Sequence, residues 1–175
     1  WGFPESFAVA FSVLILGFIL QIFTGSGVSL PGWPVNIIIA AIFILYLFLI
    51  YRFVKHPVVK WLSSPQAAIA SISVFTILVL LMGFIPQKQP DAPVFLQSTG
   101  LNFITRSWAY LMTALLLLVI LGFTIIRRFL PITVKNMAFF LNHAGLWIVI
   151  VAASLGSADL WRLSLPIEEG GVSFT

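Results

Sequence analysis

Five long apolar stretches dominate this sequence of 175 residues, and they constrain its fold more than any motif does. A helix needs roughly 20 predominantly apolar residues to cross the hydrocarbon core of a bilayer, and each stretch is close to that length. The expected spans are residues 7–23, 35–54, 66–85, 107–126 and 138–157. The predicted fold class is therefore an all-α polytopic membrane protein with about five transmembrane helices.

Composition supports this class and divides the chain. Hydrophobic residues make up 61% of it and charged residues 8%, against roughly 45–50% and 25% in soluble domains. We assign residues 1–157 to a transmembrane helical domain. Residues 158–175 are more polar, and their alternation of Leu163, Leu165 and Ile167 with polar residues predicts a strand leaving the membrane. We expect this segment to begin an extracytoplasmic β-rich domain, and the chain to be part of a longer protein.

Basic residues predict the orientation. Three lysines or arginines follow the second span and three follow the fourth, against none after the first, two after the third and one after the fifth. The side richer in lysine and arginine is usually cytoplasmic, so we expect the N-terminus inside and the C-terminus outside. The net charge of +4 is explained by topology, and we predict no nucleic-acid partner.

Two polar segments allow narrower expectations. The longest polar loop, 87–106, has room for a short interfacial helix or a lid. At the outer end of the last span, Asp159 and Arg162 are three residues apart and predict a weak surface pair.

Motifs of soluble enzymes are absent from the sequence. It has no dinucleotide or phosphate-binding glycine loop, no nucleophile elbow and no HExxH zinc motif. The five carboxylates are scattered, and without cysteine the chain has no thiol redox centre, cysteine-ligated iron–sulfur cluster or CxxCH haem attachment site.

His143 is the one histidine expected inside the membrane. A polar ring at that depth needs a partner, so it is a functional candidate. Phe139 and Trp147 lie one turn to either side of it, and they would form a wall for a flat, apolar, metal-containing ligand. The alternative is a packing histidine hydrogen-bonded to an adjacent helix.

The last span also has a face of small residues that would let a neighbouring helix approach closely. This face consists of Ala138, Asn142, Gly145, Ala152 and Gly156.

The segments NHAGLWIVIVAASLGSADLWRLSLPIEEGG, LLMGFIPQ and LNFITRSWAYLMTALLLLVILG together resemble the ResB (CcsB) proteins of System II cytochrome c biogenesis. The resemblance covers roughly residues 64–171. It implies a multi-pass protein of the bacterial inner (cytoplasmic) membrane that transiently binds b-type haem and helps move it outward to apocytochrome c. The implied partner is a CcsA-like membrane protein, which carries the tryptophan-rich haem-presenting motif absent here. ResB is the non-catalytic part of that system, so the sequence leaves enzyme activity open.

The resemblance further implies that His143 is an axial haem ligand. Arg127, Arg128, Lys135 or Arg52, expected at the same membrane face, could pair with the haem propionates. The second axial ligand would come from a partner, from water or from His56. Two other readings remain open, namely a b-type haem or quinone-reactive anchor of an electron-transfer complex, and a cofactor-free structural subunit.

Overall fold

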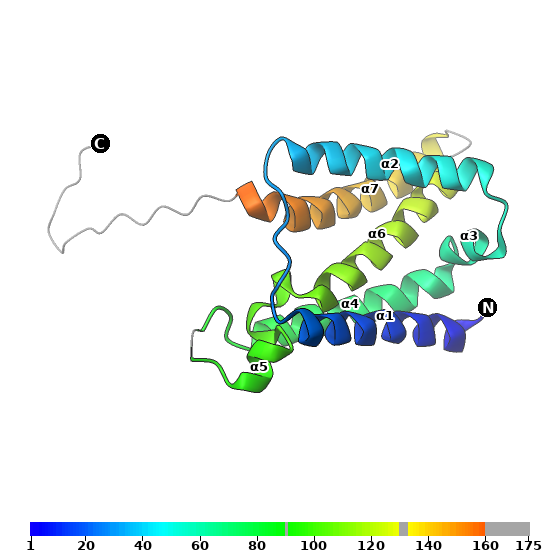
Figure 1. Cartoon of the computed structure of the whole chain (residues 1–175). Coiled ribbons are helices and arrows are strands. Elements are labelled where there is room, and N and C mark those ends of the chain that lie inside the picture. The colour runs from blue at the N-terminus through cyan, green and yellow to red at the C-terminus, as the bar shows by residue number, and fades with distance from the viewer. Residues whose placement is uncertain (90, 130–132, 160–175) are drawn as a thin grey trace, which may run out of the picture.

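Five long helices make up most of the described part of the chain, as the apolar stretches predicted (Figure 1). The computed structural model describes residues 1–89, 91–129 and 133–159, without the side chains of Lys135, Ser157 and Ala158, and within them all regular structure is helical. The predicted strand and most of the segment 158–175 lie outside the described residues. The long helices are α1 (Phe3–Thr24), α2 (Val35–Phe53), α4 (Pro65–Phe84), α6 (Trp108–Phe129) and α7 (Val134–Leu155).

Short helices occupy two of the connections. α5 (Val94–Ser98) and the 3₁₀ helix η1 (Leu101–Arg106) lie in the long polar loop, where a short helix was expected. α3 (Pro57–Leu62) was not predicted, because six residues are too few for a periodic pattern. It begins at a proline that follows His56, whose Nδ1 accepts a hydrogen bond from the Val58 amide. A second 3₁₀ turn, η2 (Gly156–Asp159), follows α7.

The helix bounds differ from the predicted spans mainly at the polar ends. α7 begins at Val134, four residues before the expected start, because the Thr133 side chain accepts from the Asn136 amide and caps it. His143 is therefore nine residues from the helix start, or about 13.5 Å along the axis. It lies deeper in the helix than the sequence suggested.

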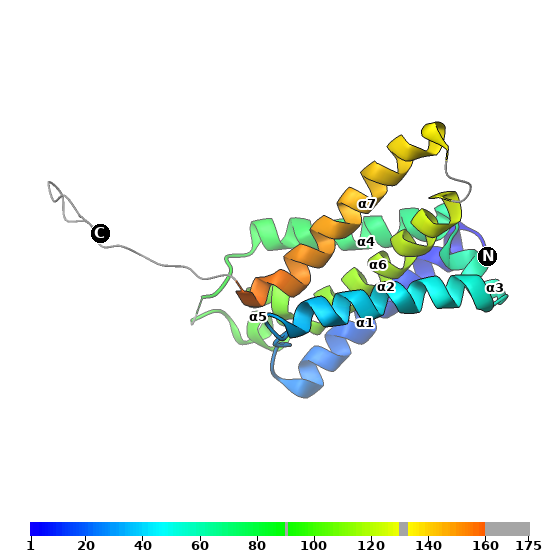
Figure 2. The ribbon, with the colours of Figure 1, turned by 90° about the horizontal axis from the view of Figure 1, so that it is seen from above.

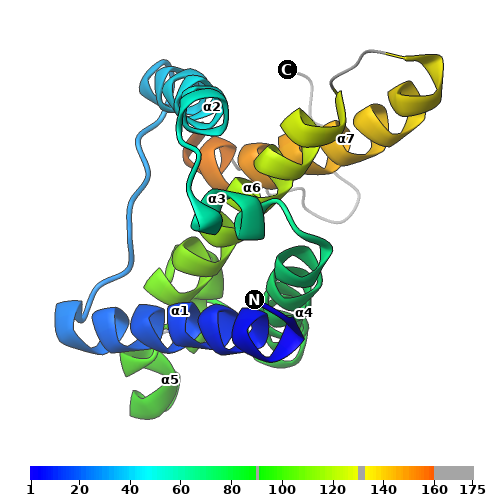
Figure 3. The same cartoon turned by 90° about the vertical axis from the view of Figure 1, so that its right-hand side faces the viewer.

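α6 is the central helix of the bundle. Ten of its 22 residues are buried, whereas α2 buries two of 19. It packs against α1, α4, α7 and α2, so that the other long helices surround it (Figure 3). α7 runs obliquely to α2 and α4, and its N-terminal half diverges from α2 (Figure 2). This divergence leaves the start of α7 beside the end of α6.

α1 and α6 approach each other closely at Gly17. A Cβ at this position would lie 2.5 Å from the Ala109 Cα and 3.0 Å from the Trp108 carbonyl oxygen. One turn further along α1, buried Gln21 accepts a hydrogen bond from the Trp108 amide and so satisfies a free donor at the start of α6. A glycine and a buried amide therefore fix the register of the central pair.

Asp159 joins the end of α7 to the start of α2. Its carboxylate accepts hydrogen bonds from the Trp33 amide at 2.7 Å and from the Asn36 side-chain amide at 2.5 Å. A negative charge at a helix N-terminus is favourable, so this contact stabilises α2. The predicted partner, Arg162, lies outside the described residues.

The face of small residues predicted on α7 lies open in the structure. Gly145 and Gly156 have no heavy atom within 4 Å of an added Cβ, and Ala138, Asn142 and Ala152 are exposed. Within the described part of the chain, no helix packs on that face. The small residues at the tight contact are instead Gly17 and Ala109.

Both predicted basic clusters lie at one end of the bundle. The end of α2, the short helix α3, the end of α6 and the start of α7 meet there (Figure 1). This end, the basic end, carries Arg52, Lys55, Lys60, Arg127 and Arg128. Lys135 belongs to the first turn of α7, but its side chain lies outside the described residues.

Candidate functional site: a histidine cavity at the basic end

A cavity of about 390 Å³ opens between the start of α4, the end of α6 and the first half of α7. We call it the histidine cavity. It brings together four residues that the sequence singled out, His143, Phe139, Arg127 and Arg128. The remaining lining residues, for which the sequence offered no signal, come from the α3–α4 turn, α4 and α6. They are Ser63, Pro65, Ala68, Ile69 and Thr124.

The hydrogen bond of His143 determines which of its two ring nitrogens carries the hydrogen. Nδ1 lies 2.9 Å from the Phe139 carbonyl oxygen in the same helix. A carbonyl only accepts, so Nδ1 carries the hydrogen, and the neutral ring then has its lone pair on Nε2. No hydrogen bond within the described part of the chain reaches Nε2. A backbone carbonyl on the other ring nitrogen is the usual way in which a metal-binding histidine is oriented.

This contact bears on the packing alternative. The observed partner of His143 is its own helix, one turn back, rather than an adjacent helix. The ring is half-buried and borders the cavity. It is thus oriented and accessible.

Phe139 and Arg128 extend the histidine into a three-layer stack. The Phe139 and His143 ring centroids are 3.7 Å apart, with 24° between their planes. The Arg128 guanidinium carbon lies 4.5 Å from the Phe139 centroid, within cation–π range. The stack holds one arginine of α6 against α7 and leaves its positive charge at the rim of the cavity.

Arg127 is held on the other side of the same rim. Its Nη1 donates to the Ser63 carbonyl oxygen at 3.0 Å, across the α3–α4 turn. The remaining guanidinium N–H groups are available, since the side chain is exposed. Two guanidinium groups therefore flank a cavity whose inner wall includes Ala68 and Ile69.

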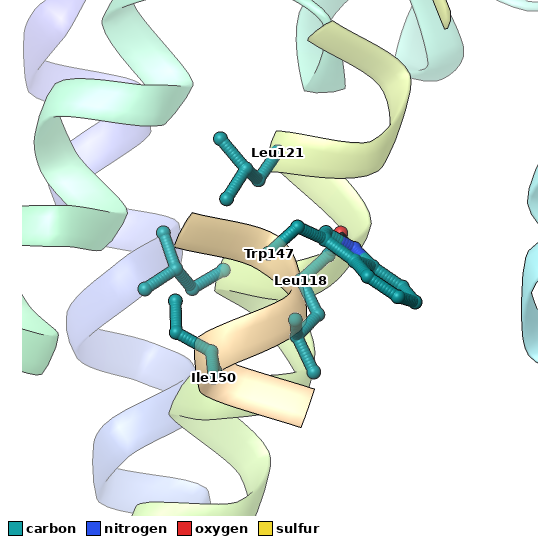
Figure 4. Close-up of a cluster of buried hydrophobic side chains, with 5 residues drawn as sticks. Leu118, Leu121, Trp147 and Ile150 are labelled. Atoms are coloured by element: carbon teal, nitrogen blue, oxygen red, sulfur yellow. Dashed lines mark hydrogen bonds between the residues drawn. The ribbon is translucent and has the colours of Figure 1, made fainter. Parts of the chain in front are cut away.

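Trp147 lies on a different face of α7, and the structure does not bring it to the cavity. Its indole Nε1 donates to the Leu118 carbonyl oxygen at 3.0 Å, and its ring stacks on Phe43 with centroids 6.2 Å apart. Figure 4 shows Trp147 and Ile150 from α7 against Leu118 and Leu121 from α6. Because these contacts turn the indole toward α6 and α2, its geometry is that of a packing residue between helices.

His56 is also separate from the histidine cavity. It lines a neighbouring cavity at the basic end, and the two cavities share only Ser63 and Arg127. Among the described residues, moreover, no three histidine or carboxylate side chains gather closely enough to hold a metal ion. A metal ion bound at His143 would therefore need further ligands, from a cofactor or a partner.

Comparison with known proteins identifies no relative: no family model, curated protein or solved structure matches this chain.

Proposed function

We propose that the protein binds haem inside the membrane through Nε2 of His143 and helps move it outward for attachment to apocytochrome c. The observation that carries this proposal is the geometry of His143, whose bonded Nδ1 leaves a free lone pair at a cavity flanked by Arg127 and Arg128. The resemblance of the chain to ResB proteins motivates the choice of haem among flat metal-containing ligands.

The donor set of the histidine cavity suits haem. A neutral imidazole nitrogen can ligate haem iron, and the porphyrin would supply its own four nitrogen ligands, so one histidine is enough on this side. Guanidinium groups form strong, paired hydrogen bonds with carboxylates and would hold the propionates. The cavity volume of about 390 Å³ lies in the range of about 300–1,000 Å³ typical of cofactor and ligand sites.

The proposed direction of transport follows from charge. The basic end would face the cytoplasm, as in the positive-inside rule, with the N-terminus inside and the C-terminus outside in a bacterial inner membrane. Haem would then enter the histidine cavity from the side on which it is made. The proposed partners are a CcsA-like membrane protein, which would accept the haem, and apocytochrome c.

Replacement of each histidine in turn tests the proposal, because the chain has two. Purified wild-type protein titrated with haem in detergent should give a saturable Soret shift. His143→Ala should raise the Kd for haem at least about tenfold. Replacing even a residue that only hydrogen-bonds to a metal ligand lowers metal affinity by about 10–100-fold. Added imidazole should restore part of the spectrum, because it can fill the vacated axial position.

His56→Ala is the matched control and should leave both affinity and spectrum unchanged. If His143→Ala binds haem as the wild type does, His143 is a packing residue and the proposed function fails. If neither the wild type nor the control binds haem at all, a cofactor-free structural subunit becomes the better account.

A further inference from the structure

We propose that a second site at the basic end binds one anionic phospholipid, with its phosphate in a basic cavity and an acyl chain in an adjoining apolar groove. This inference does not rest on haem binding, although Arg127 borders both cavities. The basic cavity, of about 640 Å³, lies between the end of α2, α3 and the end of α6. It is lined by Lys55, His56, Lys60 and Arg127.

The charge of this cavity is uncompensated. No carboxylate is among the described residues that line it. Among the described residues, Glu5 is the one acidic side chain near this end, and it accepts a hydrogen bond from the Gly2 amide at the start of its own helix. Lysine and arginine side chains that converge without an acidic partner favour an anionic ligand.

Two of the donors are already oriented. His56 Nδ1 accepts from the Val58 amide at 3.3 Å, so the neutral ring carries its hydrogen on Nε2 and can donate it. The bond from Arg127 Nη1 to the Ser63 carbonyl fixes the guanidinium while leaving its other N–H groups free. Both can donate to phosphate oxygens, with the two lysines adding mobile positive charge.

An apolar groove continues from the basic cavity along the bundle. It has a volume of about 460 Å³, and Val54, His56 and Val59 line both spaces. Its walls are apolar side chains of α2, α3 and α6, among them Ile50 and Val119.

α2 and α6 pack against each other beside the groove. A Cβ at Gly122 would lie 2.7 Å from Leu47 Cδ1, so the helices approach closely there. Toward the basic end, the Tyr51 ring of α2 and the Phe123 ring of α6 have centroids 6.1 Å apart. The short helix α3 lies below α2 (Figure 3), and its residues line the groove together with those of α2 and α6.

The joined spaces match the two ends of a phospholipid. Basic pockets between transmembrane helices on the cytoplasmic side bind anionic headgroups. A free phosphate ion would occupy the basic cavity but make no use of the groove. Charge complementarity together with apolar continuity therefore selects an anionic lipid over an inorganic anion.

Native mass spectrometry of the purified protein tests the site, with phosphatidylglycerol and phosphatidylcholine of identical acyl chains as probes. The wild type should retain one phosphatidylglycerol molecule in preference to phosphatidylcholine. Lys55→Gln with Lys60→Gln should weaken its retention by about tenfold or more, because each basic residue near an anionic lipid contributes several-fold. Val119→Phe, which fills the groove without changing charge, should weaken it as well.

The matched charge control is Lys88→Gln with Arg106→Gln, which removes two positive charges at the opposite end. Equal retention of the two lipids by the wild type, or equal effects of the two double variants, would overturn the proposal. The proposal would also be overturned if inorganic phosphate displaced the bound phosphatidylglycerol and Val119→Phe retained it as the wild type does. The basic cavity would then be a site for phosphate alone. If the variant with both Lys55→Gln and Lys60→Gln does not elute as a single species in size-exclusion chromatography, Lys60→Gln alone replaces it in the test. Haem affinity should be unchanged in the lysine variants, so this proposal and the haem proposal can fail separately.

Discussion

Gly17→Ala should destabilise the bundle, although alanine is the better helix former. The new Cβ would lie 2.5 Å from the Ala109 Cα and 2.9 Å from its amide nitrogen. Carbon atoms in contact prefer about 3.5–4.0 Å, so α1 and α6 must separate by roughly 1 Å. Both nearest atoms belong to the backbone and no side chain can rotate away, so the strain spreads along the helix pair.

The expected magnitude follows from two opposing terms. Overpacking of a tight interface costs about 1–3 kcal/mol, whereas removing a helical glycine stabilises by about 0.5–1 kcal/mol. The net loss in the free energy of unfolding should be about 1 kcal/mol, within a range of about 0–2.5 kcal/mol.

Gly145→Ala is the matched control, because it is the same change in the middle of a long helix with no atom within 4 Å of the new Cβ. It should be neutral or stabilising by up to about 1 kcal/mol. Unfolding in mixed micelles with increasing dodecyl sulfate, followed by circular dichroism, measures both. Equal effects of the two changes would refute the assignment of the α1–α6 contact.

Three other changes test further contacts. Asp159→Ala should lower the free energy of unfolding by about 1–3 kcal/mol, because the Trp33 amide loses its acceptor and the buried Asn36 amide keeps only the Leu155 carbonyl oxygen; the exposed Asp91→Ala should have little effect in the same assay, and equal losses would contradict the assigned role. Arg127→Gln with Arg128→Gln should reduce the haem content, measured by the pyridine haemochrome spectrum, without changing membrane insertion, measured by membrane fractionation. An unchanged haem content would contradict the proposed contact between these arginines and the propionates. Reporter fusions after Lys60 and Gln89 should report cytoplasmic and extracytoplasmic locations respectively, and the opposite result would reverse the proposed direction of haem entry.

Hydropathy was sufficient to predict the five long helices, because a bilayer demands continuous apolar runs whatever the packing. It could not identify the central helix. α6 owes its position to contacts such as Gly17 with Ala109, and a glycine in an apolar run has the same appearance whether it meets a backbone or lipid. The small-residue face of α7 is the opposite case, because its spacing suits close packing but no helix of the described chain covers it.

The candidate site was predictable in part for a related reason. Phe139, His143, Arg127 and Arg128 were selected by helical spacing and by their shared membrane face, and these constraints carry over into three dimensions. Trp147 satisfies the same spacing, but its indole donates to Leu118 on a neighbouring helix. Spacing along one helix reveals neither the side-chain rotamer of Trp147 nor the carbonyl group to which its indole donates.

The central claim is that Nε2 of His143 binds haem iron, and nuclear hyperfine spectroscopy of the ferric haem complex tests it most directly. In His56→Ala, His143 is the one histidine left in the chain. Protein labelled with ¹⁵N-histidine should then show a ¹⁵N coupling to the iron that disappears when His143 is also replaced by alanine. A haem complex that forms with full affinity and shows no ¹⁵N coupling would contradict the account.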